Sequence, residues 1–300
     1  MRVLCTSDWH IRKKRPKNRL DENYFGTIKS KIKQIFKIAE DTKCEAILQP
    51  GDMFDDFDLS HETIRETIKL LNESPCIIIT IPGQHDLKYH SKVWTNSPIG
   101  IADVGTKVQV IPKGVVTHIE NISIQGSAFG EDIPEPYNEE AFKILICHKM
   151  IIPDPIPFDY DYTMEEMLEF GYDLVVSGDN HKSFYYYKDN KHLFNCGSLM
   201  RTRIDQSDHF PCVVVFDTDA LVYNKIDLEV EPFNSVMDVE KAEEEEKKNE
   251  HLEAFIAKIE AGVDEEEETN FRKLFVHEME TKKKELGEDV ISVLKEVMII

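Results

Sequence analysis

The sequence has no long hydrophobic run, and its wholly apolar stretches are only a few residues long, as at 77–79. A membrane-spanning helix needs about 20 consecutive apolar residues, so we expect no contact with a membrane interior. The first residues also lack the apolar segment and the small-residue cleavage site of a secretory signal peptide. We therefore expect a cytoplasmic protein.

Cysteine pairs and a nucleotide-binding loop are missing too. The six cysteines are widely spaced, form no C-x-x-C pair and lie mostly in apolar segments. This pattern predicts reduced, buried thiols of an intracellular protein. No G-x-x-x-x-G-K-[ST] motif is found, so the sequence does not supply a P-loop ATPase of its own.

Basic residues are scarce. The 300 residues include 36 Lys and Arg against 57 Asp and Glu, which gives a net charge of −21. Such a chain repels nucleic acid and anionic membranes over most of its surface. DNA binding therefore requires a local basic patch, a metal or a partner subunit. The apolar fraction of 41% is sufficient for a packed core in one large domain, with or without an appendage.

The first two thirds of the sequence alternate strand-like and helix-like patterns. Helices are predicted at 24–41, around 64–71 and at 164–170. Strands are predicted at 2–6, 46–49, 76–81, 108–111, 122–125, 143–147, 174–177, 184–187, 212–216 and 221–226. The alternation at the start indicates βαβ units with right-handed crossovers. We expect an α/β fold, with a mixed sheet or two stacked sheets and helices outside.

The composition changes near residue 231. Residues 236–300 contain 20 acidic and 10 basic residues, with acidic runs at 243–246 and 265–268 that are typical of solvated segments. Apolar residues at helical spacing predict helices at 252–259, 271–275 and 290–297. These helices pack either on their own domain or on a partner as helix-in-groove anchors. We divide the chain into a domain at 1–230 and an acidic helical tail at 231–300.

Most residues that can carry chemistry follow the end of a predicted strand. Because the carboxyl ends of strands in an α/β sheet converge on one crevice, five distant loops can bring these side chains together. They are Asp8, His10, Asp52, Gln84, His85, His148, Asp179 and His181. Carboxylate and imidazole are the usual ligands of manganese, zinc and iron, and a pair of metal ions needs one bridging carboxylate. The alternative is an unrelated scatter of polar loop residues.

The series D-x-H, G-D, G-[NQ]-H-D, H and G-x-x-H resembles the calcineurin-like metallophosphoesterases. Within that superfamily, T-S-D-W-H at 6–10, G-D-M-F-D at 51–55 and G-S-L-M-R at 197–201 are similar to the nuclease subunit of the SbcCD complex and to phage recombination nucleases. The resemblance covers residues 1–230. It implies a two-sheet β-sandwich flanked by helices, in a bacterial or phage-infected cell.

The resemblance implies two divalent metal ions, with the Asp52 carboxylate bridging them. The first ion takes Asp8, His10 and His181, and the second takes Gln84, His148 and Asp179. His85 is not a ligand: it faces the scissile phosphate, where it stabilises charge or protonates the leaving oxygen, and Asp86 orients it. The ions polarise the phosphodiester and lower the pKa of a bound water.

Two residues depart from the family pattern. Gln84 replaces the usual Asn and keeps the amide oxygen one methylene further out. Asp179 replaces the usual first His of G-H-x-H and keeps a ligand atom as a carboxylate. We therefore favour an altered but active second metal site over an inactive one. The additional oxygen donors favour Mn²⁺, or Mg²⁺, over zinc.

A basic segment at 12–19 stands out in this acidic chain, with six bases in eight positions. It begins two residues after His10. We expect Arg12, Lys13, Lys14 and Arg15 to contact the phosphates of DNA, which would guide the backbone without reading its sequence. The alternative is a solvated surface loop. Arg201 and Arg203 are further candidates for phosphate contacts.

Together these features predict a manganese-dependent DNA exonuclease or endonuclease subunit that acts in recombination or repair. The resemblance implies a homodimer and an SMC-like coiled-coil ATPase partner, similar to the SbcC subunit and bound through C-terminal helices. Two alternatives remain. One is a metallophosphatase that acts on a phosphomonoester or a small phosphodiester. The other is a non-catalytic assembly subunit with an altered metal site.

Overall fold

A computed structural model describes residues 1–243, except 92, 138–140, 157–158 and 242. One compact unit spans Met1–Val239. The helices predicted at 252–259, 271–275 and 290–297 lie outside the described residues. No described helix combines the length and the apolarity that a membrane span requires.

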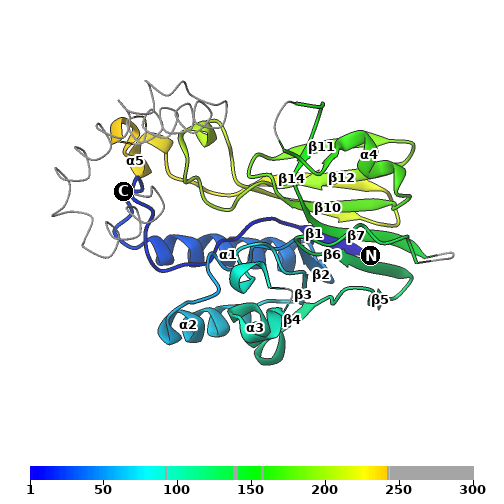
Figure 1. The fold of residues 1–300 in the computed structure, drawn as a ribbon, viewed down its shortest axis with the longest axis horizontal. Helices are drawn as coiled ribbons and strands as arrows, with labels where there is room; N and C mark the ends of the chain where they lie inside the picture. The colour runs from blue at the N-terminus through cyan, green and yellow to red at the C-terminus, as the bar shows by residue number, and fades with distance from the viewer. Residues whose placement is uncertain (92, 138–140, 157–158, 242, 244–300) are drawn as a thin grey trace, which may run out of the picture. The chain divides into compact units, whose positions relative to one another are not determined.

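Two six-stranded mixed sheets form the centre of the domain (Figure 1). The first has the order β14 (Val222–Asp227), β13 (Cys212–Asp217), β1 (Arg2–Cys5), β2 (Ala46–Gln49), β3 (Ile77–Thr80) and β4 (Val108–Val110). The second has the order β11 (Phe184–Lys188), β12 (Lys191–Asn195), β10 (Leu174–Asp179), β7 (Phe142–Lys149), β6 (Ile122–Ser127) and β5 (Val116–Ile119). A short parallel pair joins β8 (Ile151–Ile152) to β9 (Tyr162–Thr163).

Helices cover the outer faces of both sheets (Figure 1). The first sheet packs against α1 (Tyr24–Asp41), α2 (His61–Leu71) and α3 (Pro98–Gly105), and the second packs against α4 (Met164–Glu169). Strand β1 shows why the layers form: Leu4 packs with the helices, while Val3 and Cys5 pack between the sheets. Two stacked sheets flanked by helices are therefore confirmed. The last helix among the described residues, α5 (Phe233–Val236), follows β14.

Helix α1 has the predicted bounds and a polar exception on its buried face. The side chain of Asn23 caps the helix by accepting a hydrogen bond from the Gly26 amide. Ile28, Ile32 and Ile35 are fully buried against the first sheet. Lys31 lies on the same face and is only 6% exposed.

The parallel strands aim their carboxyl ends at one edge of the molecule. In the first sheet β1, β2 and β3 are parallel, and in the second β7 and β10 are parallel. The register of the second pair sets Gly178 beside His148. The loops that leave these five strands therefore meet, and they carry the residues singled out in the sequence.

Candidate metal centre

Four of the predicted ligands occupy an unusual backbone conformation. Asp8, His10, Asp52 and Asp179 have φ values of 33°, 44°, 49° and 78°. Non-glycine residues seldom adopt this left-handed region, and such strain gathers at functional sites because the surrounding structure must enforce it. The sharp turns after β1, β2 and β10 thus direct these side chains into a common crevice.

Asp52 lies at the centre of the crevice. Its Oδ2 atom is 3.4 Å from His148 Nε2 and 3.7 Å from His10 Nε2. Its Oδ1 atom accepts a hydrogen bond of 2.8 Å from the His85 amide. Burial alone would raise the pKa of Asp52, but His148 and His10 outweigh it and lower that pKa. Asp52 is therefore an ionised carboxylate shared by imidazoles from both sheets.

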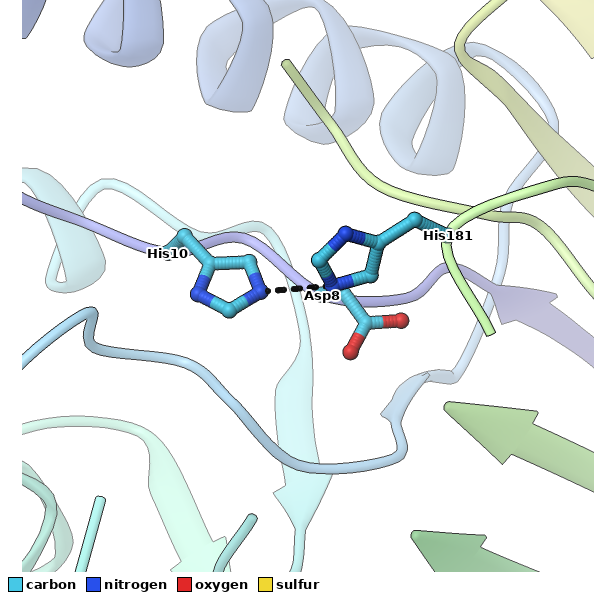
Figure 2. A group of neighbouring side chains, drawn as sticks. All are labelled: Asp8, His10 and His181. Atoms are coloured by element: carbon cyan, nitrogen blue, oxygen red, sulfur yellow. Dashed lines mark hydrogen bonds between the residues drawn. The ribbon is translucent and has the colours of Figure 1, made fainter. Parts of the chain in front are cut away.

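Asp8, His10 and His181 form one side of the crevice (Figure 2). The two Nε2 atoms of the histidines face each other at 3.1 Å. Asp8 Oδ1 accepts a hydrogen bond from the Asp179 amide, and its Oδ2 accepts one from the hydroxyl of Ser7. Two imidazole nitrogens and a held carboxylate thus converge from segments 171 residues apart.

His148 occupies the other side and is buried. Its Nδ1 donates to the Pro50 carbonyl at 2.8 Å, which leaves Nε2 as the nitrogen that can bind a metal. Within the described part of the chain Nε2 has no hydrogen-bond partner, and Asp179 Oδ1 lies 4.0 Å away. Burial opposes protonation of His148, but Asp52 and its neighbouring carboxylates raise the pKa to about 10. A cation fits where this unsatisfied nitrogen faces two carboxylates.

Two glycines make this close packing feasible. A Cβ atom on Gly83 would lie 2.1 Å from Asp52 Oδ1, and one on Gly178 would lie 2.9 Å from His148 Nδ1. Any larger residue would therefore displace a candidate ligand. This explains the glycines that precede Gln84 and Asp179 in the sequence motifs.

The ligand atoms form three overlapping groups, and within each group they lie within 4.8 Å of one another. The groups are Asp8, His10 and His181; His10, Asp52 and His85; and Asp8, Asp52 and His148. Their mixed oxygen and nitrogen donors suit divalent transition metals. Because Asp52 belongs to two of the groups, the arrangement suits neighbouring ions that share a carboxylate.

Gln84 and His85 follow β3. Both line a cavity of about 420 Å³, together with Asp55. His85 also lines a second cavity of about 300 Å³ with His10 and His181. The two cavities thus meet at His85, which belongs to one of the metal-binding groups although the resemblance gave it no ligand role.

Asp55 is a functional residue that the sequence analysis quoted in a motif but gave no role. Its Oδ1 lies 3.3 Å from His10 Nδ1, and its main-chain oxygen accepts a hydrogen bond of 3.0 Å from His85 Nδ1. Its Oδ2 pairs with Arg12 Nη1 at 2.5 Å. The main-chain oxygen of Asp55 therefore fixes the ring of His85, and its carboxylate lies beside Nδ1 of His10, so that both Nε2 atoms are left for the crevice. The position of Asp55 in the motif G-D-M-F-D at 51–55 was the feature of the sequence that could have indicated this role.

Asp86 is placed differently from the expectation that it orients His85. Its buried carboxylate accepts hydrogen bonds from the amides of Met53, Phe54 and Gly83. Burial, followed by the charge of Asp52, raises its pKa to about 7. Asp86 thus ties the loop after β2 to the loop after β3, while the Asp55 carbonyl contacts His85.

The basic segment divides into buried and exposed parts. Lys13, Lys14 and Arg15 are exposed, and Lys13 pairs with Glu62 at 2.7 Å. Arg12 is half-buried in its pair with Asp55 and lines the cavity beside His10. Arg19 is 3% exposed and lies elsewhere. Within this segment the exposed charges are therefore those of Lys13, Lys14, Arg15 and Lys17.

Parts of this chain are similar in sequence to known proteins. Residues 1–183 match the family model described as calcineurin-like phosphoesterase. The chain is 26% identical over 194 residues to the DNA double-strand break repair protein Mre11 of Methanosarcina mazei, and 24% identical over 196 residues to that of Methanosarcina acetivorans. Each alignment covers 61% of this chain but only 30% and 31% of the relative, so the chain spans less than a third of these relatives.

A solved structure shares the fold. The protein TT1561 of Thermus thermophilus has a TM-score of 0.50 at 13% sequence identity, over 76% of this chain and 99% of that one. The family match covers more than half of the chain and includes the loops that supply Asp8, Asp52, His148 and Asp179. The chain therefore belongs to the calcineurin-like phosphoesterases, a family of metal-dependent hydrolases.

Proposed function

We propose that this metallophosphoesterase is a DNA nuclease subunit that hydrolyses phosphodiester bonds with two divalent metal ions, Mn²⁺ in preference to Mg²⁺. The observation that carries the proposal is the Asp52 carboxylate, which faces imidazoles from both sheets. The similarity to two Mre11 repair proteins supports DNA as the substrate. Asp8, His10, Asp52, Gln84, His148, Asp179 and His181 would hold the ions.

When bound, the ions supply polarisation of the phosphodiester and a water of lowered pKa. The chain supplies position and protons. His85 donates its Nδ1–H to the Asp55 carbonyl, so in the imidazolium form its Nε2–H is the proton that would pass to the leaving oxygen. Asp55 also holds His10. The exposed bases at 13–15 would contact flanking phosphates.

The partner assignments are part of the proposal. A net charge of −21 leaves little basic surface for DNA, so a partner that supplies such a surface suits this chain. We propose a homodimer and an SMC-like coiled-coil ATPase as its assembly, with the acidic tail at 231–300 as the docking segment. Co-purification of the ATPase with the full chain but not with residues 1–243 would test the tail.

The nuclease proposal is tested with end-labelled linear duplex and single-stranded DNA in Mn²⁺. We expect stepwise shortening or internal cleavage by the full chain and none by Asp52→Asn. An active chain that prefers a phosphomonoester over DNA would instead make it a phosphatase. Lys37→Gln is the matched control, because Lys37 is exposed on α1 and pairs with Asp41.

A further inference from the structure

A further cavity lies apart from the metal ligands. It has a volume of about 730 Å³, within the range of small-molecule sites. Its lining comes from the start of α1, from Arg19, from Arg201 and from the segment that leads into α5. Asp8, Asp52 and His148 do not contribute to it.

Three buried cations surround this cavity. Arg19, Lys31 and Arg201 are 3%, 6% and 5% exposed. Arg19 is neutralised by Asp21, with two hydrogen bonds of 2.8 and 2.9 Å. Arg201 donates to the Glu231 carbonyl and lies over the Phe233 ring, neither of which carries a countercharge.

Lys31 is the least satisfied of the three. Its Nζ is buried and has no hydrogen-bond acceptor among the residues that the structure describes. Its charged surroundings are Arg201, Arg19 and Asp21, so cations outnumber anions around it. A buried ammonium without a partner is costly, and an anion in the cavity would remove that cost.

The start of α1 adds to the positive field. Asn23, Gly26 and Thr27 line the cavity at the amino-terminal end of this 18-residue helix, whose first turn contains no acidic residue. The amino-terminal end of a helix carries a partial positive charge that attracts anions. The helix end and the buried cations thus both favour an anionic ligand.

The rim restricts the size of that ligand. Glu22, Glu229 and Glu231 also line the cavity and are exposed. These carboxylates repel a polyanion such as a DNA backbone, which would have to pass along the rim. A small anion that reaches the interior meets the cations instead.

We propose that this cavity binds a small phosphate-bearing ligand, either inorganic phosphate or the phosphate group of a mononucleotide, through Lys31 and Arg201. This site is independent of the proposed nuclease activity, because it uses none of the metal ligands. Lys31 supplies the unpaired ammonium and Arg201 a guanidinium without an ionic partner.

The test measures the melting temperature and the binding heat of the full chain with inorganic phosphate, deoxyadenosine monophosphate and deoxyadenosine. Asp52→Asn in EDTA serves as the parent, so that phosphate on bound metal does not contribute. We expect both phosphate-bearing ligands to raise the melting temperature and deoxyadenosine to leave it unchanged. Tighter binding of the monophosphate than of inorganic phosphate would identify a nucleotide site, and equal binding would identify a phosphate site.

Lys31→Met in the same parent is expected to bind phosphate roughly 10- to 100-fold more weakly while remaining folded, because it loses a charge-assisted contact. Lys37→Met is the matched control on the exposed face of the same helix and should bind like the parent. No stabilisation of the parent by phosphate would overturn the proposal. So would equal binding by Lys31→Met.

Discussion

The metal crevice and the cationic cavity around Lys31 are built with opposite charge. The crevice gathers the carboxylates of Asp8, Asp52 and Asp179. The buried charges of the cavity are Lys31, two arginines and one aspartate, and the three glutamates that also line it are exposed at its rim. Both bury like charges, which is unfavourable without a counter-ion. The sign of the uncompensated charge therefore indicates the ligand of each region: cations in the metal crevice and an anion in the cationic cavity.

One segment, residues 198–202, lies between the two regions. Ser198, Met200 and Thr202 line the cavity next to His10, whereas Arg201 lines the cationic cavity. The side chains of this segment are therefore divided between the two cavities. A substitution in one region should therefore leave the other intact, and the predictions below use that separation.

The largest effect is expected from His85→Ala. Loss of a proton donor typically costs 10²- to 10⁴-fold in rate, and we predict a fall in kcat of that order. Because the resemblance gives His85 no ligand role, the number of bound Mn²⁺ ions should stay the same. Kinetics on labelled DNA, together with calorimetric titration of Mn²⁺, checks both. Loss of an ion would make His85 a ligand instead.

Next is the pH dependence of stability due to Lys31. Burial, followed by Arg201 and Arg19, lowers its pKa from 10.5 to about 8 in the folded chain. Between these values the unfolded chain binds more protons, so this contribution to stability rises with pH from about 8 to 10.5. Without phosphate, Lys31→Met should be more stable than wild type at pH 7.5, by up to about 3 kcal/mol. Urea unfolding should show the gap closing towards pH 10.5, and a constant gap would contradict the account.

Asp55→Asn should have a smaller effect, on the metal crevice alone. Removing a residue that orients a metal ligand typically costs 10- to 100-fold in affinity or activity, and we predict that loss because His10 would be less firmly held. The phosphate response of the cationic cavity should not change. An exposed acid on α4, Glu169, provides the control as Glu169→Gln. Full activity of Asp55→Asn would show that Asp55 does not position His10.

The smallest effect concerns the exposed basic segment. Replacing Lys13, Lys14 and Arg15 by Gln should weaken DNA binding and flatten its salt dependence, by roughly 0.9 in slope for each phosphate that the segment no longer neutralises. Fluorescence anisotropy over a range of salt concentrations measures that slope. Lys33 and Lys37, exposed on α1, provide matched controls. An unchanged slope of DNA affinity against salt concentration would show that residues 13–15 do not contact DNA phosphates.

Local patterns were sufficient to predict much of the fold. The α1 helix has the predicted bounds, and β2 does too, because their apolar periodicity is strong and their ends carry clear signals. Strand β11 was predicted at 184–187, but its hairpin partner β12 was missed, although Asp189 and Asn190 have φ values of 52° and 62° and make a two-residue turn typical of hairpins.

Other features depend on distant contacts and could not be read locally. Helix α3 contains two glycines and was missed. A Cβ on Gly100 would lie 2.5 Å from the Thr95 carbonyl oxygen, so its helix is set by packing and not by propensity. The place of β1 between β2 and β13 joins residues more than 200 positions apart, which no periodicity encodes.

The geometry of the candidate site also depends on contacts between distant residues, which the sequence alone does not predict. The sequence marked Asp52 and His148 because each follows a strand, but their 3.4 Å approach depends on the stacking of two sheets. The contact of His85 with the Asp55 carbonyl was missed because a main-chain acceptor leaves no mark in a motif. Lys31 did leave a signal: it stands three residues after Ile28 and four before Ile35 on the apolar face of its helix.

If Asp52 is shared by two metal ions, the number of Mn²⁺ ions that the chain binds must depend on its carboxylate. Isothermal titration and native mass spectrometry of the full chain should give two ions per wild-type chain and fewer than two for Asp52→Asn. The phosphate response of the cationic cavity should persist in that variant, which shows that it is folded. A single ion in wild type, or two ions bound with unchanged affinity by Asp52→Asn, would contradict the account.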